Sequence, residues 1–302
     1  MDKKLIQCIA FKCLVFICLF PYAGLHAISM VYNFRIAQVT RQPIFEKSSD
    51  RRNTLIGLLF EQYRKKYNGP RQNNVGGLAS YIYDFHPYYI RTDCAVSHIH
   101  EKIDHTTSFA GTETDDILFT FGRSFNGNDY TTFTVSGLFG IPTHKIYRLI
   151  HTDFGYSQVG TGLQFDGLYE FNPISAFIYG ARYIYFFPRK AYDNLGQRYT
   201  FTLGNVGDLL VAAKSKWPKH GVEFGYTARF RFGAHICPHL DDIVQKANYI
   251  RSNFYFVYQY KFLIHQTSNR LMFNIAYGFD HKSKIFGNKY IITFWASWNL
   301  NF

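Results

Sequence analysis

The segment Tyr290–Phe302, with the sequence YIITFWASWNLNF, alternates between two kinds of residue. One set is almost entirely apolar and consists of Tyr290, Ile292, Phe294, Ala296, Trp298, Leu300 and Phe302. The intervening set is more polar and consists of Ile291, Thr293, Trp295, Ser297, Asn299 and Asn301. Successive side chains of a β-strand project to opposite faces, so the segment predicts a strand with one apolar face and one largely polar face.

The same alternation recurs along the chain. Apolar residues take every second position in Leu271–Phe279, Phe254–Ile264, Val222–Phe232, Leu163–Phe171 and Phe133–Ile141. The positions between them carry charges, amides and glycines. We expect strands of about ten to fifteen residues, which are longer than those of most soluble sheets and suit a tilted crossing of a membrane.

The connections between these strands alternate in length. Short turns are predicted at residues 125–129, 172–173, 214–220 and 266–269, where Asn126-Gly127 and Asn172-Pro173 are turn signals. Longer connections are predicted at residues 103–115, 142–155, 188–196 and 235–248, with a shorter one near 281–288. This rhythm predicts an all-β fold, a single antiparallel transmembrane β-barrel with short periplasmic turns and longer extracellular loops.

The expected number of strands is about twelve, within a range of roughly ten to fourteen. Twelve agrees with the even number that such barrels have. The segment 77–102 is expected to hold two strands that are separated near His86-Pro87. Residues 54–67 are expected to form another strand. A helix or plug is the alternative there, since Ile56, Leu59, Phe60 and Tyr63 also lie at helical spacing.

The N-terminus predicts export. Lys3 and Lys4 precede an apolar core, Cys13–Phe20, and small residues lead to a cleavage site after Ala27. An uncleaved anchor helix is the alternative. The expected organisation is a signal peptide at residues 1–27, a periplasmic lead or plug at 28–52 and a barrel at 53–302.

The composition of the 302 residues agrees with this interpretation. Aromatic residues make up 19% of the chain, with 24 Tyr and 31 Phe, and the formal charge is +12. Removing residues 1–27 takes away three Lys and one Asp, so 12 − 3 + 1 leaves +10. An exported chain without basic runs is a poor candidate for binding nucleic acid. Of the five cysteines only Cys94 and Cys237 remain, and a disulfide between them is left open.

The signal and the aromatic C-terminus resemble those of Gram-negative outer-membrane β-barrel proteins. The resemblance implies an outer-membrane location, contacts with membrane lipid and lipopolysaccharide, and recognition of Phe302 by the barrel assembly machinery. The segments LFGIPTHK (138–145) and GTGLQFDGLYEF (160–171) resemble an outer-membrane transporter family linked to the breakdown of phenol and other aromatics. That family commonly ends the strand with Pro-Thr-Gly, whereas this chain has Pro142-Thr143-His144, so the likeness implies transport but no particular substrate.

Charged residues on the polar faces are the candidate lumen-lining residues. Arg229, Arg231 and Lys261, with His265, are expected to form a basic wall that favours anions. The same faces carry four acidic residues, Glu223, Asp166, Glu170 and Asp280. The alternative is that acids and bases pair with one another and fill the barrel.

Two histidine-containing segments are weak candidates for metal binding. His98 and His100 lie on one face of an expected strand, and His105 follows in the next connection. The loop CPHLDD at 237–242 offers His239, Asp241 and Asp242. Neither segment provides a complete ligand set, so we expect no metal and no cofactor.

Enzymatic activity is not expected. Ser97 and His98 are adjacent in an expected strand, so they point to opposite faces and cannot form a nucleophile–base pair. The sequence contains no nucleophile elbow, phosphate loop or metalloprotease helix. We expect a channel for passive diffusion of small solutes, hydrophobic or anionic, through a polar basic lumen. The alternatives are a structural or adhesive surface barrel with a closed interior and, third, a barrel enzyme.

Overall fold

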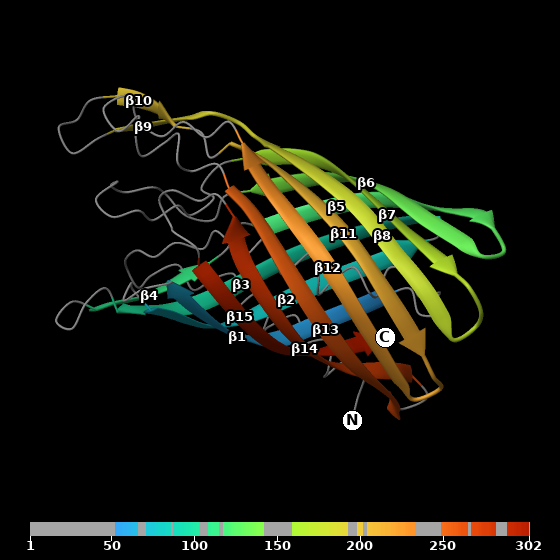
Figure 1. Ribbon diagram of the computed structural model, residues 1–302. Coiled ribbons are helices and arrows are strands. Elements are labelled where there is room, and N and C mark those ends of the chain that lie inside the picture. Colours follow the sequence, from blue (N-terminus) through green and yellow to red (C-terminus); the bar gives the residue numbers. More distant parts are fainter. Residues whose placement is uncertain are drawn as a thin grey trace.

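The computed structural model describes residues 52–65, 71–85, 87–102, 108–114, 117–141, 159–192, 198–201, 204–232, 249–264, 267–281 and 289–301. These residues form fifteen β-strands, shown in Figure 1. The bounds are β1 Arg52–Lys65, β2 Arg71–Phe85, β3 Tyr88–Lys102, β4 Ser108–Thr114, β5 Ile117–Asn128, β6 Thr131–Ile141, β7 Gly160–Glu170, β8 Ser175–Phe186, β9 Arg189–Tyr192, β10 Arg198–Phe201, β11 Asn205–Lys216, β12 His220–Phe232, β13 Tyr249–Ile264, β14 Thr267–His281 and β15 Lys289–Asn301.

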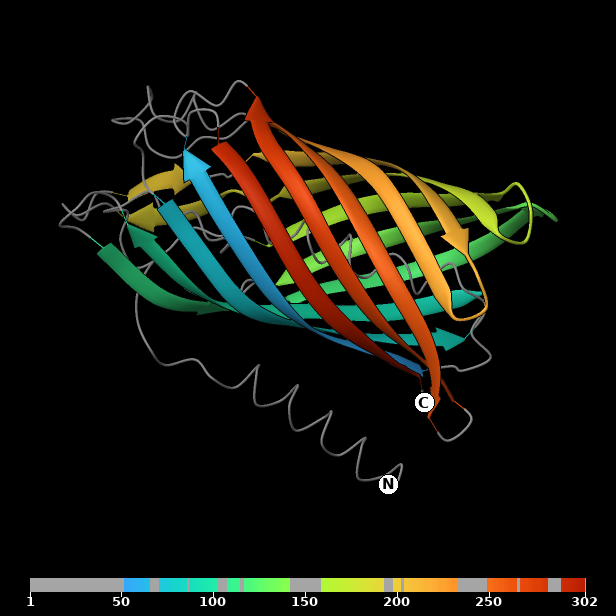
Figure 2. The same ribbon diagram turned by 60° about the horizontal axis from the view of Figure 1, so that its bottom comes forward.

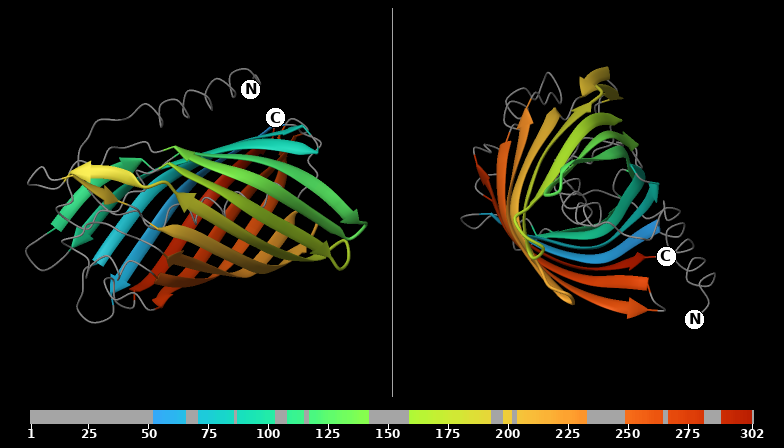
Figure 3. Two further views of the ribbon diagram at one scale, coloured as in Figure 1. Left: turned by 90° about the horizontal axis from the view of Figure 1, so that it is seen from above. Right: turned by 90° about the vertical axis from the view of Figure 1, so that its right-hand side faces the viewer.

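Thirteen of these strands pair into one antiparallel sheet that curves into a barrel (Figure 3). The pairings run from β1 through β15, β14, β13, β12, β11, β8, β7, β6 and β5 to β3, which pairs with β2, and β2 pairs with β1 again. The pairings therefore return to their start after twelve strands. β4 is the thirteenth: β5 pairs with the first half of β3 and β4 with the second half, so β4 continues the line of β5.

Closure of the sheet explains why long strands of this kind are stable in an apolar medium. A strand that has neighbours on both sides leaves no row of unpaired backbone groups, and each such group is costly to bury in hydrocarbon. β1 and β15, the first and last of the described strands, lie side by side in Figure 2 and pair over the whole length of β15 from Lys289 to Asn301. The predicted antiparallel barrel is confirmed, and the number of strands agrees with the expected twelve.

The turn between β7 and β8 and the turn between β11 and β12 lie at the same end of the barrel (Figure 1). β7 and β8 are joined by residues 171–174, and β11 and β12 by residues 217–219. The Asn172 side chain accepts hydrogen bonds from the backbone N–H groups of Ile174 and Ser175, which fixes that turn. The small β9–β10 hairpin lies at the opposite end of the barrel from these two turns.

The structure corrects several details of the predicted connections. The turns predicted at 214–220 and 266–269 are shorter than expected, because β11 continues to Lys216 and β14 begins at Thr267. The turn predicted at residues 125–129 is wrong, because β5 continues to Asn128 and the turn is at Asp129–Tyr130. A register shift between Asn126 and Asn128 takes up the extra residue. The connection predicted at 103–115 contains a strand, β4, and the one predicted at 188–196 includes β9.

Residues 54–67 also have a definite outcome. The structure has a strand there, β1, which ends at Lys65, so the helical alternative is wrong for the described part. β1 begins at Arg52, one residue before the predicted start of the barrel. The predicted signal at 1–27, the lead up to residue 51, Phe302, His265 and Cys237 lie outside the described residues. Among the described residues, no helix is long and apolar enough to cross a membrane.

Candidate functional site

The two faces of the sheet differ in composition and in exposure. On the outer face, large apolar side chains such as Phe224, Phe256 and Phe273 are exposed. On the inner face the intervening side chains are buried, and many are polar or charged. A soluble protein buries its apolar side chains instead, so this arrangement suits a barrel whose outside contacts lipid.

The inner face carries an excess of positive charge. Among the described residues, seven cationic side chains are buried against four anionic ones. The cationic residues are Arg91, Arg182, Lys214, Arg229, Arg231, Arg251 and Arg270, and the anionic residues are Asp93, Asp166, Asp208 and Glu223. Buried cations therefore outnumber buried anions among the described side chains.

Four of these residues form a charged row across neighbouring strands: Arg182 of β8, Asp208 of β11, Arg229 of β12 and Arg251 of β13. Each is the register partner of the next. Arg229 donates from Nε to Asp208 Oδ1 at 2.7 Å and from Nη2 to Oδ2 at 3.1 Å. Arg182 donates from Nε to Asp208 Oδ2 at 2.8 Å and also from Nη2 to the same oxygen. Asp208 is thus held between two arginines whose planar donors fix its orientation.

The row of register partners continues on the other side with uncharged residues. Arg182 lies opposite Gln164 of β7, Gln164 opposite Ser136 of β6, and Ser136 opposite Gly122 of β5. The Tyr89 ring extends from β3 over Gly122 and its hydroxyl shares a hydrogen bond with the Ser136 hydroxyl. A Cβ at Gly122 would lie 2.4 Å from that ring, so the close approach requires glycine.

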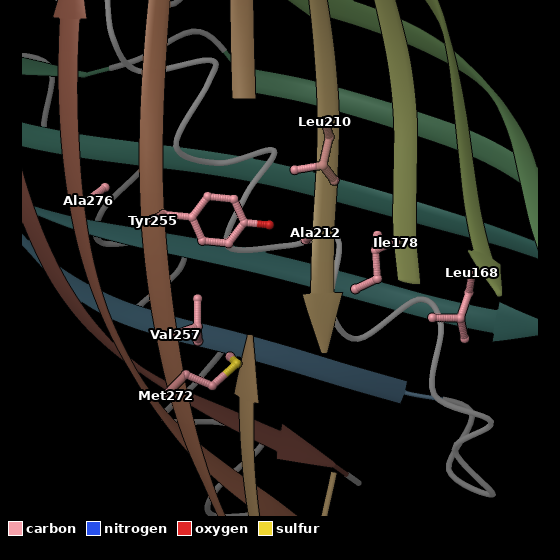
Figure 4. Packing of buried hydrophobic residues seen from close by; sticks show 8 residues of the cluster. All are labelled: Leu168, Ile178, Leu210, Ala212, Tyr255, Val257, Met272 and Ala276. Atoms are coloured by element: carbon pink, nitrogen blue, oxygen red, sulfur yellow. The ribbon is translucent and has the colours of Figure 1, made fainter. Parts of the chain in front are cut away.

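An apolar cluster lies on the inner face next to the charged row, on the side of the short turns (Figure 4). It consists of Leu168, Ile178, Leu210, Ala212, Tyr255, Val257, Met272 and Ala276. Leu210 follows Asp208 by two residues on β11, and both side chains are buried. Along β11 the inner wall therefore changes from charged to apolar within about 7 Å, the length of two residues in a strand. On β12 and β13 the corresponding inner positions are the buried polar residues Thr227 and Asn253.

Tyr255 joins this cluster to a second charged region. Its ring covers Gly225 of β12, where an added Cβ would lie 2.4 Å from the ring, and Figure 4 shows it directed from β13 toward Ala212. The Tyr255 hydroxyl donates a hydrogen bond of 2.7 Å to Glu223 Oε1. Glu223 is the register partner of Lys214, and both side chains are buried. The apolar cluster is thus bordered by charged groups on both sides along the barrel.

The structure places the predicted site residues as follows. Arg229, Arg231 and Glu223 have buried side chains on the inner face of β12, and Asp166 is buried on β7, where it accepts a hydrogen bond from Gln164. Lys261 is half-buried near the short-turn end of β13. Glu170 is exposed at the end of β7. Asp280 is the register partner of Arg251, its side chain is not among those described, and His265 lies outside the described residues.

The histidines do not gather into a site within the described residues. His98 is exposed on β3, and His100 lies two residues further along the same strand. The part of the chain that the structure describes contains no group of three side chains suited to hold a metal. His105, His239, Asp241 and Asp242 lie outside that part.

Sequence reasoning missed the centre of the charged row. Arg182, Asp208 and Arg251 were not among the predicted residues, although each is a charge at a polar-face position of its strand. That parity was the available signal, as in IYGARYIY around Arg182 and NVGDLLVA around Asp208. Their grouping depends on register across strands, which no single strand reveals.

Comparison with known structures identifies the architecture. The COG4313 outer membrane channel from Pseudomonas putida F1 superposes with a TM-score of 0.65 and 11% sequence identity, covering 83% of this chain and 96% of that one. This is the fold of outer-membrane β-barrel proteins. The translocator domain of the autotransporter NalP from Neisseria meningitidis has a TM-score of 0.54 and 9% identity, covering 89% and 94% of the two chains.

These identities are low, so the likeness establishes the fold and the expected resemblance to outer-membrane barrels. The CymD monoaromatic hydrocarbon channel superposes with a TM-score of only 0.45 at 8% identity, and we draw nothing from that match. No protein-family model matches the sequence, and no curated protein matches it either.

Proposed function

We propose that the protein is an outer-membrane channel for small solutes. The observation that carries the proposal is the inverted arrangement of the barrel, with exposed apolar residues outside and charged residues such as Arg229 and Asp208 inside. Lipid satisfies the outer face, while an inner face of this kind gives polar solutes a path of hydrogen-bonding and charged groups. The first structural neighbour is an outer-membrane channel, which supports the proposal.

The excess of buried cations gives the channel a preference for anions. Arg231 and Arg251 lie on either side of Arg229, one along β12 and the other on β13. A passing anion gains favourable electrostatic energy near such groups, and a passing cation is repelled. Candidate enzymatic roles receive no support from the neighbours, which are named as a channel and a translocator domain.

One observation favours a second candidate, a structural barrel with a closed interior. Arg229 is 0% exposed and Asp208 is 4% exposed, so little of the charged row is in contact with solvent in this structure. Solutes can pass through such an interior only if the side chains of the charged row rearrange, or if the remaining space lets few solutes through at a time. Small conductance is therefore the expected behaviour.

Ion current across a planar bilayer tests both candidates. Purified protein is expected to give discrete current steps, with a reversal potential in a salt gradient that shows anion preference. Changing Arg231 and Arg251 to Gln should shift that potential toward cations, whereas changing the exposed, outward Arg123 to Gln should leave it unchanged. We avoid Arg229→Glu, because it would place two carboxylates together at Asp208. Protein that is folded, inserted and electrically silent at all voltages would favour the closed structural barrel.

A further inference from the structure

We propose that the inner wall binds small organic anions in which a carboxylate is attached to an apolar ring or chain. This inference rests on the proposed channel function and names the class of solute. The site combines two regions that are already defined: the charged row, with Arg231 beside it, and the apolar cluster next to the row. Neither region alone selects such a compound.

The cationic part of the site has an excess of positive charge over the acids that are in register with its arginines. Arg182, Arg229, Arg231 and Arg251 contribute four positive charges, and Asp208 contributes one negative charge. Asp280, the register partner of Arg251, adds one more acid, so cations still outnumber anions by four to two. A carboxylate that enters this region is attracted by the excess positive charge, and a guanidinium group that turns toward it can donate to both of its oxygens.

The apolar part lies at the right distance for the rest of such a solute. Leu210 is two residues from Asp208 along β11, and Ile178 lies four residues from Arg182 along β8, on the same inner face. A strand rises about 3.3 Å per residue, so the apolar side chains begin about 7 Å from the row and extend to about 13 Å. A benzene ring attached to a carboxylate reaches the near edge of the cluster at Leu210, and a longer chain of carbons extends further into it.

The two regions also explain what the wall would reject. An inorganic anion or acetate gains from the arginines but covers none of the apolar cluster. A neutral aromatic alcohol contacts the apolar cluster but gains no electrostatic attraction from the charged row. Each buried CH₂ group contributes about a fourfold factor in affinity, so an aromatic carboxylate should bind more than tenfold tighter than acetate.

The test is a calorimetric titration of the folded barrel in detergent with three probes: sodium benzoate, sodium acetate and benzyl alcohol. We expect benzoate to bind more than tenfold tighter than either of the others. Equal binding of benzoate and acetate would overturn the inference. Folding of every variant is verified by its different gel migration before and after boiling.

Two adjacent leucines provide a matched control for the apolar part. Leu210 is buried on the inner face, whereas Leu209 is exposed on the outer face of the same strand. Leu210→Thr should weaken benzoate binding by about fourfold to tenfold and leave acetate binding unchanged. Leu209→Thr should change neither. If Leu210→Thr fails to fold, Leu210→Ala replaces it, and equal effects of the inner and outer variants would contradict the proposal.

Two arginines provide the control for the charged part. Arg251→Gln should weaken benzoate and acetate alike, by about fivefold to tenfold, since one charged hydrogen-bonding group is lost. Benzyl alcohol should be unaffected. Arg123→Gln on the outer face should change none of the three. Loss of benzoate affinity in Arg123→Gln but not in Arg251→Gln would place binding outside the barrel and overturn the proposal.

The bilayer experiment separates this inference from the proposed function. In potassium chloride alone, current steps report the channel itself. Added benzoate should then reduce the current at concentrations where acetate does not. If current steps occur but benzoate does not reduce them selectively, the proposed channel function is supported and the organic-anion site is contradicted. If benzoate binds selectively in detergent but the protein gives no current, the organic-anion site is supported and the channel function is contradicted.

Discussion

The two faces of β11 show how one strand meets two different environments. Leu209 is 51% exposed on the outer face, and its neighbour Leu210 is 4% exposed on the inner face. Asp208 is held by two arginines on the inner face, while the outer positions Leu209 and Val211 are exposed and apolar. The difference fits a barrel whose outside contacts lipid and whose inside depends on pairing among polar groups.

The largest expected effect comes from breaking the inner pairing. Asp208→Ala removes the common partner of Arg182 and Arg229 and leaves buried positive charges close together. We expect a loss of about 3–5 kcal/mol in the free energy of unfolding, as for other buried ion pairs that lose one member. Urea titration of the barrel in lipid vesicles measures this quantity. Asp129→Ala, at an exposed turn aspartate, is the control and should be close to neutral.

A charge on the outer face tests the contact with lipid. Leu209 lies near the middle of β11 and is exposed, so Leu209→Arg would place a guanidinium in the apolar layer. The expected cost is about 2–4 kcal/mol in the same titration. Ile174→Arg makes a similar change at an exposed position of the turn between β7 and β8, and it should cost little, because that turn lies at the end of the barrel. Equal effects of the two substitutions would argue against a lipid-facing outer surface.

A smaller effect is expected from two glycines that face opposite sides. Gly122 lies beneath the Tyr89 ring on the inner face, whereas a Cβ at Gly137 would meet no atom within 4 Å. Gly122→Ala must displace the ring and its hydrogen bond with Ser136, at a cost of about 1–3 kcal/mol. Gly137→Ala should be neutral or slightly stabilising. A stable Gly122→Ala barrel would show that Tyr89 moves at little cost.

Much of the fold could be predicted because alternation is a local property. Side chains an even number of residues apart share a face of a strand, as Phe273 and Ile275 do on β14. Side chains an odd number apart lie on opposite faces, as Phe224 and Arg229 do on β12. Turn chemistry was less reliable. Asn126-Gly127 is a strong hairpin signal, yet the register shift next to it moves the turn to Asp129–Tyr130. β4 was missed because SFAGTET shows little contrast between its two faces.

The site was harder to predict, since it depends on which residues of different strands come into register. Leu168 and Leu210 occupy positions of the polar face, so alternation alone gave no reason to expect an apolar cluster inside. The contact of Tyr255 with Glu223 crosses β12–β13 and passes over a glycine. The pairing register of a strand depends on all of its neighbours and on the turns between them, so it could not be predicted from the pattern of each strand alone.

The pairing of β1 with β15 has a consequence for biogenesis. The seam joins the two ends of the folding unit, with Asn53 opposite Asn301 and Lys65 opposite Lys289. A nascent chain that stops before residue 289 would hold two open edges, one on β1 and one on β14. Open edges invite another chain to add a strand, so truncated copies should aggregate or swap strands rather than make leaky pores. Closure of the described barrel therefore requires β15.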